Sequence, residues 1–468
     1  MQLGEKLRES RRAMSDAARP RVVEERHAAG FLTARERLEA LLDPGSAVHY
    51  GAINGRAGDE WIATTGGVDV AGTVAGMPIV ASSTDYTDRG GGYGGGRLTR
   101  LYALAHEHRW PIVLFADGGG SRAAYPPASE RVGLGTPVGR FGLFEGMAEL
   151  SASVPTIAVV SGPSYAGHAS LAAFCDFLVA TQGSSIGMGG PPMVEAALGL
   201  RLTHQELGAV ERQEQLGGID LLVEDEPAAI VAIRRYLSYL RDEPAGDASS
   251  NAGNIASLVL ADGAYDVRPV IEALVDAASF FELKPNSATA VVTGWARLGG
   301  RTLAVVASQP ASATQGAIDP AAASKLARFV EIADAYRTPV LALVDTPGFV
   351  LHDGDGRVRP GMTRQHARPL LVHQHRTVPV LSVQVRRGGG LAPFALTGYG
   401  PGRATAPLRL AWPTVDLSGV DGFAAPVADA NAFDDVIDPS ETREYLIRLL
   451  SRIPRPQRDG KTRRVDSC

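Results

Sequence analysis

Four short apolar runs, each introduced by a proline, stand out from the mixed sequence around them. They fall into two pairs, and the runs are Trp110–Asp117, Val154–Gly162, Thr338–Asp345 and Val378–Arg386. Continuous apolar runs of this length are typical of strands that are buried on both faces of a largely parallel sheet. The pattern therefore predicts four central strands in two groups.

The spacing of the introducing prolines indicates that the chain contains one structural unit twice. Pro111 and Pro155 lie 44 residues apart and Pro339 and Pro379 lie 40 apart, so the two copies are offset by 228 and 224 residues. In both copies a hairpin pattern and an amphipathic helix precede the strand pair; the hairpins are Gly72–Thr84 and Ala296–Gln309, and the helices are Leu98–His108 and Ala321–Tyr336. Strands that alternate with helices predict α/β layers.

We therefore predict an α/β fold made of two tandem homologous domains. The N-terminal domain covers residues 1–245 and the C-terminal domain covers residues 255–468. Between them, Arg241–Asn254 is rich in small and polar residues and has no apolar periodicity, which is typical of a linker.

Composition narrows the class of protein without deciding its function. The chain has 468 residues, of which 45% are hydrophobic, and a net charge of −5, so nothing draws it as a whole to nucleic acid or to an anionic membrane. No apolar signal region opens the chain and no run reaches membrane-spanning length, so we expect a cytoplasmic protein. Two cysteines, Cys175 and Cys468, can form neither a zinc ribbon nor a disulfide framework.

Side-chain motifs of the common enzyme chemistries are missing. Ser121 and Ser164 lack the G-x-S-x-G elbow of serine hydrolases, and no H-E-x-x-H or Cys/His cluster predicts a metal. Gly90–Gly95 fits the dinucleotide fingerprint G-x-G-x-x-G, but Asp85–Arg89 separates it from the preceding strand. The matching loop of the second copy, Pro310–Ile318, lacks the pattern, so a nicotinamide oxidoreductase is the least favoured alternative.

Glycine-rich loops follow all four predicted strands instead. They are DGGGSR at Asp117–Arg122, GPSYAGHAS at Gly162–Ser170, DTPGF at Asp345–Phe349 and RRGGGLA at Arg386–Ala392. A strand, then glycines, then a helix brings backbone N–H groups close to a ligand. Two amides directed at one oxygen form an oxyanion hole, which stabilises a thioester enolate without any side chain. Glycines can also simply turn the chain, but corresponding loops in both copies favour a binding role.

In their order and spacing, these motifs resemble the β (carboxyltransferase) subunit of biotin-dependent acyl-CoA carboxylases of the propionyl-CoA and methylcrotonyl-CoA type, in the crotonase superfamily. The resemblance covers nearly the whole chain. DGGGSR resembles D-S-G-G-A-R, GPSYAGHAS resembles G-P-x-A-G-G-A, and DTPGF matches D-x-P-G-F. The segments at Thr33–Ser46 and Asp434–Arg443 resemble the family's entry and closing motifs. The resemblance to this family implies two crotonase (ClpP)-like domains.

The resemblance also implies a reaction and its participants. CO2 passes from carboxybiotin, carried on a separate protein, to the α carbon of an acyl-CoA, so the cofactors are carrier-borne biotin and the coenzyme A of the substrate, with no metal in this chain. The sequence has neither a Met-Lys-Met biotin site nor an ATP-binding carboxylase segment, so a biotin carboxylase/biotin carrier subunit is the expected partner. The family forms homo-oligomers, so we expect a hexamer or a dimer, with the acyl-CoA side in the N-terminal domain and the biotin side in the C-terminal domain.

Carried onto this sequence, the family's two oxyanion holes are the amides of Gly167 with His168 and of Leu391 with Ala392. Phe394, two residues beyond the second hole, corresponds to the residue that helps to choose the acyl group. The segment GPPMVE at Gly190–Glu195 resembles the family's G-P-x-x-[IV] stretch. The remaining residues that we expect to bind substrate lie in this segment and in the glycine loops; they are Gly119, Gly120, Ser121, Arg122, Gly190, Pro191 and Gly390.

Two departures from the family pattern leave alternatives open. His168 replaces the second glycine of A-G-G and Leu391 replaces the second glycine of G-G-A, which narrows the cavity. His168 is then a wall residue or, alternatively, an acid/base of a biotin-independent acyl-CoA decarboxylase or hydrolase. A third hypothesis is a non-catalytic subunit of a carboxylase complex.

Overall fold

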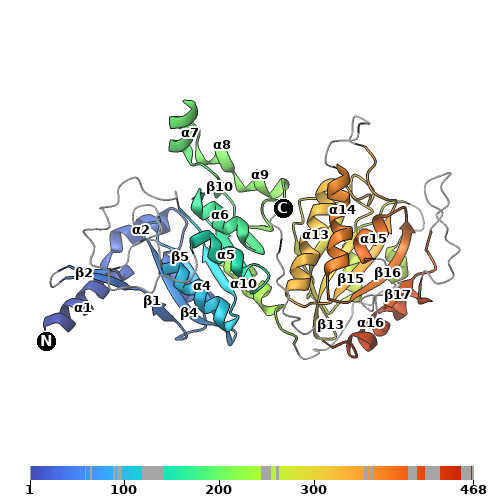
Figure 1. Ribbon diagram of the computed structural model, residues 1–468, viewed down its shortest axis with the longest axis horizontal. Helices are drawn as coiled ribbons and strands as arrows, with labels where there is room; N and C mark the ends of the chain where they lie inside the picture. Colours follow the sequence, from blue (N-terminus) through green and yellow to red (C-terminus); the bar gives the residue numbers. More distant parts are fainter. Residues whose placement is uncertain are drawn as a thin grey trace. The chain divides into compact units, whose positions relative to one another are not determined.

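One sheet topology occurs twice along the chain, in the units Met1–Leu237 and Ser238–Asp466 (Figure 1). The structure is a computed structural model. It describes residues 2–57, 60–63, 66–87, 91, 97–118, 142–243, 255–259, 263–352, 357, 362–398, 408–416, 433–454 and 465. In this described part no helix is long and apolar enough to cross a membrane.

The N-terminal unit is built on a seven-stranded sheet. Its strands, in spatial order, are β1 (Val48–Tyr50), β4 (Gly67–Val74), β5 (Met77–Thr84), β6 (Ile112–Phe115), β7 (Thr156–Val160), β9 (Phe177–Thr181) and β11 (Leu221–Val223). Two small sheets pair β2 (Ile53–Ala57) with β3 (Glu60–Ala63) and β8 (Pro163–Tyr165) with β10 (Ser185–Gly187). The helices are α1 (Gln2–Ala13), α2 (Pro20–Ala28), α3 (Ala34–Leu41), α4 (Arg97–His108), α5 (Leu143–Leu150), α6 (Gly167–Phe174), α7 (Pro191–Leu198), α8 (His204–Gly208), α9 (Val210–Gln215) and α10 (Glu226–Ser238).

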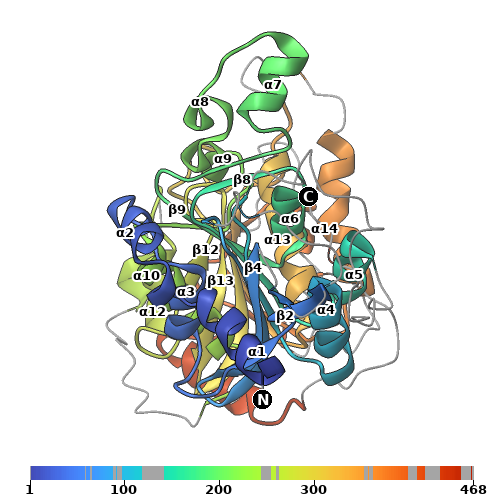
Figure 2. The same cartoon turned by 90° about the vertical axis from the view of Figure 1, so that its left-hand side faces the viewer.

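Helices cover both faces of this sheet. Helices α4, α5 and α6 lie on one side and α3 and α10 on the other (Figure 2). Apolar residues of α4, α5 and α6 share one core cluster with β6, β7 and β9. Cys175, at the end of α6, is 1% exposed and belongs to this cluster, so it contributes to packing.

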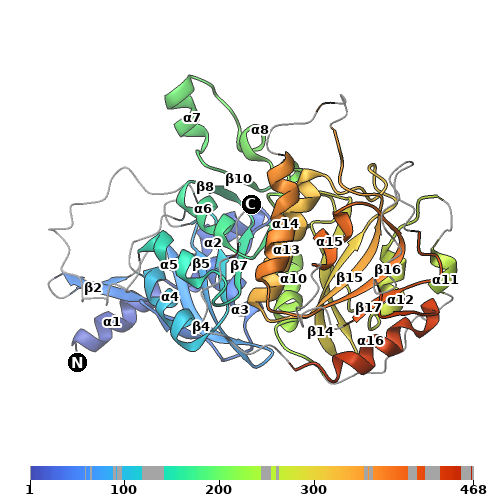
Figure 3. The same ribbon diagram turned by 45° about the vertical axis from the view of Figure 1, so that its right-hand side comes forward.

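The C-terminal unit repeats the arrangement. Its sheet has the order β12 (Phe281–Leu283), β13 (Val291–Leu298), β14 (Arg301–Ser308), β15 (Val340–Thr346), β16 (Val380–Gly388), β17 (Leu408–Ala411) and β18 (Asp435–Val436). The helices are α11 (Ile255–Leu258), α12 (Arg268–Leu274), α13 (Pro320–Ala335), α14 (Met362–His375), α15 (Ala392–Thr397) and α16 (Thr442–Leu450). Helices α13 and α14 lie on one side of the sheet and α12 and α16 on the other (Figure 3).

The strand directions also agree between the two sheets. In each, the first two junctions are antiparallel and the next four are parallel. The four proline-introduced runs form β6, β7, β15 and β16, whose residues are buried apart from the last two of β16. This confirms the predicted α/β fold of two homologous copies.

An identical set of contacts closes the antiparallel hairpin of each copy. Asp276 accepts hydrogen bonds from the N–H groups of Gly299 and Gly300, at 2.9 and 2.8 Å, in the turn between β13 and β14. Arg443 of α16 bridges Asp276 at 2.6 Å and donates to the carbonyl of Leu274. In the first copy the same roles belong to Asp43, to the turn residues Ala75 and Gly76, to Arg234 of α10 and to the Leu41 carbonyl. An aspartate therefore ties the last helix of each copy to its hairpin.

Replacing Asp276 with alanine should lower the free energy of unfolding by about 2–3 kcal/mol, because charged hydrogen bonds to the turn and to Arg443 are lost together. Urea denaturation measures the change. The control is Glu444→Ala, which removes an exposed ion pair with Arg448 within α16. It should lower the free energy of unfolding by less than about 0.5 kcal/mol. Equal costs for the two variants would contradict the role of Asp276.

Candidate functional site

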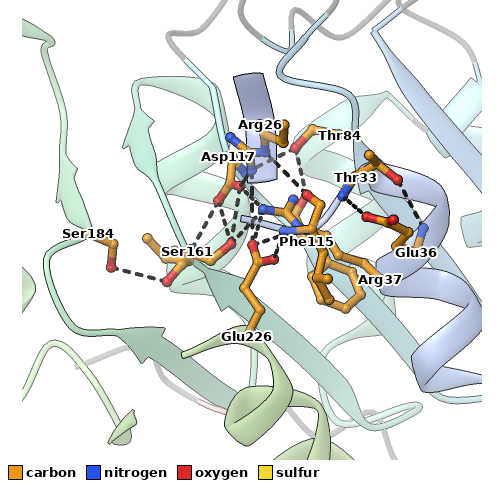
Figure 4. A network of polar contacts seen from close by, with 12 residues as sticks. Arg26, Thr33, Glu36, Arg37, Thr84, Phe115, Asp117, Ser161, Ser184 and Glu226 are labelled. Atoms are coloured by element: carbon orange, nitrogen blue, oxygen red, sulfur yellow. Dashed lines mark hydrogen bonds and ion pairs between the residues drawn. The ribbon is translucent and has the colours of Figure 1, made fainter. Parts of the chain in front are cut away.

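A buried cluster of charges lies where β6 and β7 end (Figure 4). Arg37 of α3 donates to Asp117 at 2.6 Å, to the Ser161 hydroxyl at 2.7 Å and, through Nε, to Glu226 at 2.9 Å. Arg37 and Asp117 are 0% exposed and Glu226 is 2% exposed. Arg26 of α2 adds a second cation 3.5 Å from Asp117, so two positive charges face two negative ones.

Electrostatics keeps this cluster ionised despite its burial. Burial by itself would lower the pKa of Arg37, but the charges of Asp117 and Glu226 raise that pKa above its usual value. Burial would likewise raise the pKa of Asp117, yet Arg37, Arg26 and the Ser161 N–H hold it below its usual range. Breaking one member of such a buried pair costs far more than breaking a surface pair, because the partner charge stays in the interior.

The cluster holds the start of both glycine loops of the N-terminal unit. Asp117 is the first residue of one loop and Ser161 directly precedes the other, and Asp117 accepts a hydrogen bond from the Ser161 N–H at 3.0 Å. Beyond them, Gly118 donates to the Pro163 carbonyl at 2.6 Å and accepts from the Tyr165 N–H at 2.9 Å. Gly118 of the first loop therefore lies beside Pro163–Tyr165 of the second loop, which leads to the start of α6.

Helix α6 begins with a strained residue and an available amide. Ala166, its N-cap, has φ 51° and ψ −119°, a conformation that costs a non-glycine residue about 1–3 kcal/mol. Gly167 follows as the first helical residue, and none of the described residues accepts a hydrogen bond from its N–H. A helix N-terminus combines such N–H groups with the positive end of the helix dipole, which suits a developing oxyanion.

His168, the other residue predicted for this hole, has a side chain directed into the protein. It is 1% exposed, and its Nε2 lies 2.9 Å from the Gly91 carbonyl oxygen. Burial lowers the pKa of His168 to about 4, against the opposing influence of the Gly91 hydrogen bond and the charge of Asp117. The ring is therefore neutral near pH 7 and engaged with backbone, an arrangement that favours a wall residue over an acid/base.

The C-terminal unit anchors its loops with a different set of charges. Asp345, at the end of β15, accepts from Arg386 at 3.0 Å and from Arg387 at 2.7 Å, both at the end of β16. Gly389 lies so close to the next loop that a Cβ there would be 2.0 Å from the Pro347 carbonyl oxygen. This position therefore requires glycine, and the two loops are locked together at the backbone.

Helix α15 starts directly after this contact, as α6 does in the first copy. Gly390 has φ 55°, Leu391 is the N-cap with its side chain 57% exposed, and Ala392 is buried. Among the described residues none accepts a hydrogen bond from the amides of Leu391 or Ala392. Phe394 lies one turn into the helix and is half-buried.

A comparison with known proteins identifies the family. The model of the carboxyl transferase domain matches residues 25–420. The chain belongs to the carboxyl transferase family. It is 31% identical to the methylmalonyl-CoA carboxyltransferase 12S subunit of Propionibacterium freudenreichii subsp. shermanii, over 95% of this chain and 93% of that protein.

Solved structures of this carboxyl transferase fold agree. A transcarboxylase 12S structure, described as a hexamer with methylmalonyl-coenzyme A and methylmalonic acid bound, matches with a TM-score of 0.83 and 29% identity over 98% of each chain. A single-chain, multi-domain long-chain acyl-CoA carboxylase matches with a TM-score of 0.81 and 31% identity over 95% of this chain. The present chain spans about half, 48%, of that longer protein.

Other predicted site residues of the carboxyl transferase fall elsewhere or outside the described residues. Gly190 and Pro191 are the N-cap and first residue of α7, a helix in which no described residue is buried. Gly119, Gly120, Ser121 and Arg122 lie outside the described residues, as does most of the glycine run at 90–95. The described part of the chain contains no group of three or more His, Cys, Asp or Glu side chains that could hold a metal.

The sequence pattern does not predict the charged cluster around Arg37. Arg37 carried a signal, because it lies three and four residues from Ala34 and Leu41, which are buried positions of the same helix. A capping box between Thr33 and Glu36 sets the start of this helix and hence the position of Arg37. A charged residue on the apolar face of a helix indicates a buried partner, but Glu226 lies 189 residues away and nothing in the local pattern selects it.

Replacing Arg37 with leucine should lower the free energy of unfolding by about 3–5 kcal/mol, because Asp117 and Glu226 would stay buried beside one weaker cation. Chemical denaturation measures this change. The same substitution at Arg21, whose side chain is 86% exposed, should change stability by less than about 0.5 kcal/mol. A cost below about 1 kcal/mol for Arg37→Leu would show that the cluster does not hold the loops.

Proposed function

We propose that this carboxyl transferase moves CO2 from carboxybiotin to the α carbon of an acyl-CoA thioester. The N-terminal unit takes the acyl-CoA and the C-terminal unit takes the biotin side. One observation carries the proposal: α6 and α15 occupy the same place in the two copies. Among the described residues, none accepts a hydrogen bond from the N–H of Gly167 at the start of α6 or from those of Leu391 and Ala392 at the start of α15.

The amide of Gly167, together with that of His168, would bind the thioester oxygen. When a proton leaves the α carbon, negative charge develops on this oxygen, and the N–H groups at the start of α6 stabilise it. An amide donor of this kind contributes about 10²–10³-fold to kcat in other enzymes. Because the strained Ala166 and the loop contacts fix the amide before substrate arrives, no reorganisation is needed during the reaction.

The amides of Leu391 and Ala392 fit the biotin side. The ureido group of biotin offers an uncharged carbonyl oxygen, and two neighbouring N–H donors without acceptors among the described residues suit it. Carboxybiotin, when bound, supplies both the CO2 and the base. The protein then needs only backbone donors and a dry cavity, which accounts for the absence of an acid/base pair in the sequence.

The proposal also includes the participants of the reaction. We propose that a separate biotin carboxylase/biotin carrier subunit delivers the biotin and that this chain forms a homo-oligomer. The names of similar proteins include acyl groups as different as methylmalonyl and long-chain acyl. The acyl group of this enzyme is therefore to be determined with a panel of CoA esters.

Purified protein should decarboxylate at least one carboxyacyl-CoA ester only when free biotin is added, which is the reverse half-reaction. A panel running from malonyl-CoA and methylmalonyl-CoA to long-chain esters, assayed with and without biotin, tests this expectation. Turnover independent of biotin would replace the proposal with a decarboxylase or hydrolase. Absence of CoA-ester binding would instead indicate a non-catalytic subunit.

Replacing Gly167 with proline removes the proposed donor while keeping a residue that suits the first turn of a helix. We expect kcat of the biotin-dependent reaction to fall about 10²–10³-fold. Gly167→Ala keeps the amide, and its Cβ would meet nothing closer than Phe144 at 4.0 Å, so it should keep most of the activity. Equal loss in the two variants, both folded by circular dichroism, would argue against a role of the amide.

A further inference from the structure

We propose that His168 is a positioning residue, whose imidazole ties three acyl-side segments together and so sets the direction of the amides at the start of α6. The proposal deepens the proposed function and rests on it. The three segments are those of Gly91, of Gly118 and of the first turn of α6, to which His168 itself belongs.

The imidazole ring of His168 is closely packed against Gly91 and Gly118. Its Nε2 is 2.9 Å from the Gly91 carbonyl oxygen. A Cβ placed on Gly118 would lie 2.8 Å from both Cε1 and Nε2 of the ring, so the imidazole occupies the space that any side chain at 118 would need. Gly91 in turn lies close to Asp117, because a Cβ placed on Gly91 would be 2.8 Å from the Asp117 carbonyl oxygen. Only two glycines allow the three segments to come this close.

The neutral imidazole of His168 is suited to a constant hydrogen bond with the Gly91 carbonyl. A carbonyl oxygen only accepts, so Nε2 must carry the hydrogen and donate it to Gly91. Burial keeps the pKa of His168 at about 4, so the ring stays neutral and in this role over the physiological range. A neutral imidazole that donates to backbone is a poor proton carrier, but it is a rigid side chain with little rotamer freedom once packed.

The second copy shows which part of this arrangement is special to the acyl side. Gly316 has φ 83° and its Cβ would be 2.8 Å from the Asp345 carbonyl, so it matches Gly91 against Asp117. The residue at the start of α15 that corresponds to His168, however, is Ala392, which has no group able to reach that loop. The glycine approach is thus common to both copies, whereas the histidine link belongs to the N-terminal unit.

A link of this kind should act on the rate of the chemical step more than on substrate binding. The N–H groups of α6 matter most when negative charge develops on the thioester oxygen, which happens in the chemical step and not on binding. Misplacing a catalytic group by about 1 Å can cost about 10²-fold in rate. Loss of the link should therefore lower kcat and leave KM nearly unchanged.

Three variants separate the hydrogen bond from the bulk of the ring. His168→Leu keeps an apolar filling without a donor, His168→Gln offers an amide N–H near the position of Nε2, and His49→Leu makes the same change at an exposed histidine of β1. In the biotin-dependent decarboxylation of malonyl-CoA or methylmalonyl-CoA, His168→Leu should lower kcat about 10–100-fold with KM within about threefold. His168→Gln should recover most of the loss, and His49→Leu should match the original protein.

Amide hydrogen exchange gives a readout that does not depend on activity. Peptides containing Gly91, Gly118 and Gly167 should exchange faster in His168→Leu than in the original protein and regain protection in His168→Gln. The proposal is overturned if His168→Leu leaves both exchange and kcat unchanged, or if Leu and Gln variants are impaired equally. If the original protein decarboxylates no ester, the proposed function fails, and exchange alone then decides whether the link exists.

Discussion

The ion cluster around Arg37 is the interaction on which the start of both N-terminal glycine loops depends. Its guanidinium joins α3 to the ends of β6 and β7 and to the first residue of α10, which are distant parts of the N-terminal unit. A buried guanidinium is costly unless every charge around it is matched, and the matching here requires Asp117 and Glu226 at once. The glycine loops therefore start from a point with little freedom to move, although glycine itself is the most flexible residue.

In both copies an aspartate at the end of a strand anchors the glycine loops, but the cations that pair with it differ. Both place an aspartate at the end of the second parallel strand of the sheet, Asp117 in β6's loop and Asp345 in β15, and both pack a glycine against its carbonyl. In the first copy the cation comes from a helix near the N-terminus, whereas in the second it comes from Arg386 and Arg387 on the neighbouring strand. Duplication preserved the backbone shape and the carboxylate, while the counter-charges diverged.

How much could be predicted from the sequence follows from the range of each interaction. Buried strands such as β6 and β15 are set by local apolar runs and prolines, so the duplicated α/β fold could be predicted from pattern alone. The glycine loops after them were also visible locally. Arg37 with Glu226 was not, because the partners are brought together only by tertiary packing across 189 residues. The orientation of His168 depends on the positions of Gly91 and Gly118, which no local pattern specifies.

The proposed site consists of backbone amides, so it tolerates the side chains of His168 and Leu391. The amides of His168 and Leu391 exist whatever side chain each residue carries, provided that the φ and ψ angles stay allowed. Leu391 directs its side chain to the surface and His168 directs its own into the protein, so neither blocks its own N–H by necessity. Side chains next to the amides can therefore change with local packing, while the N–H groups that we propose for the enolate stay the same.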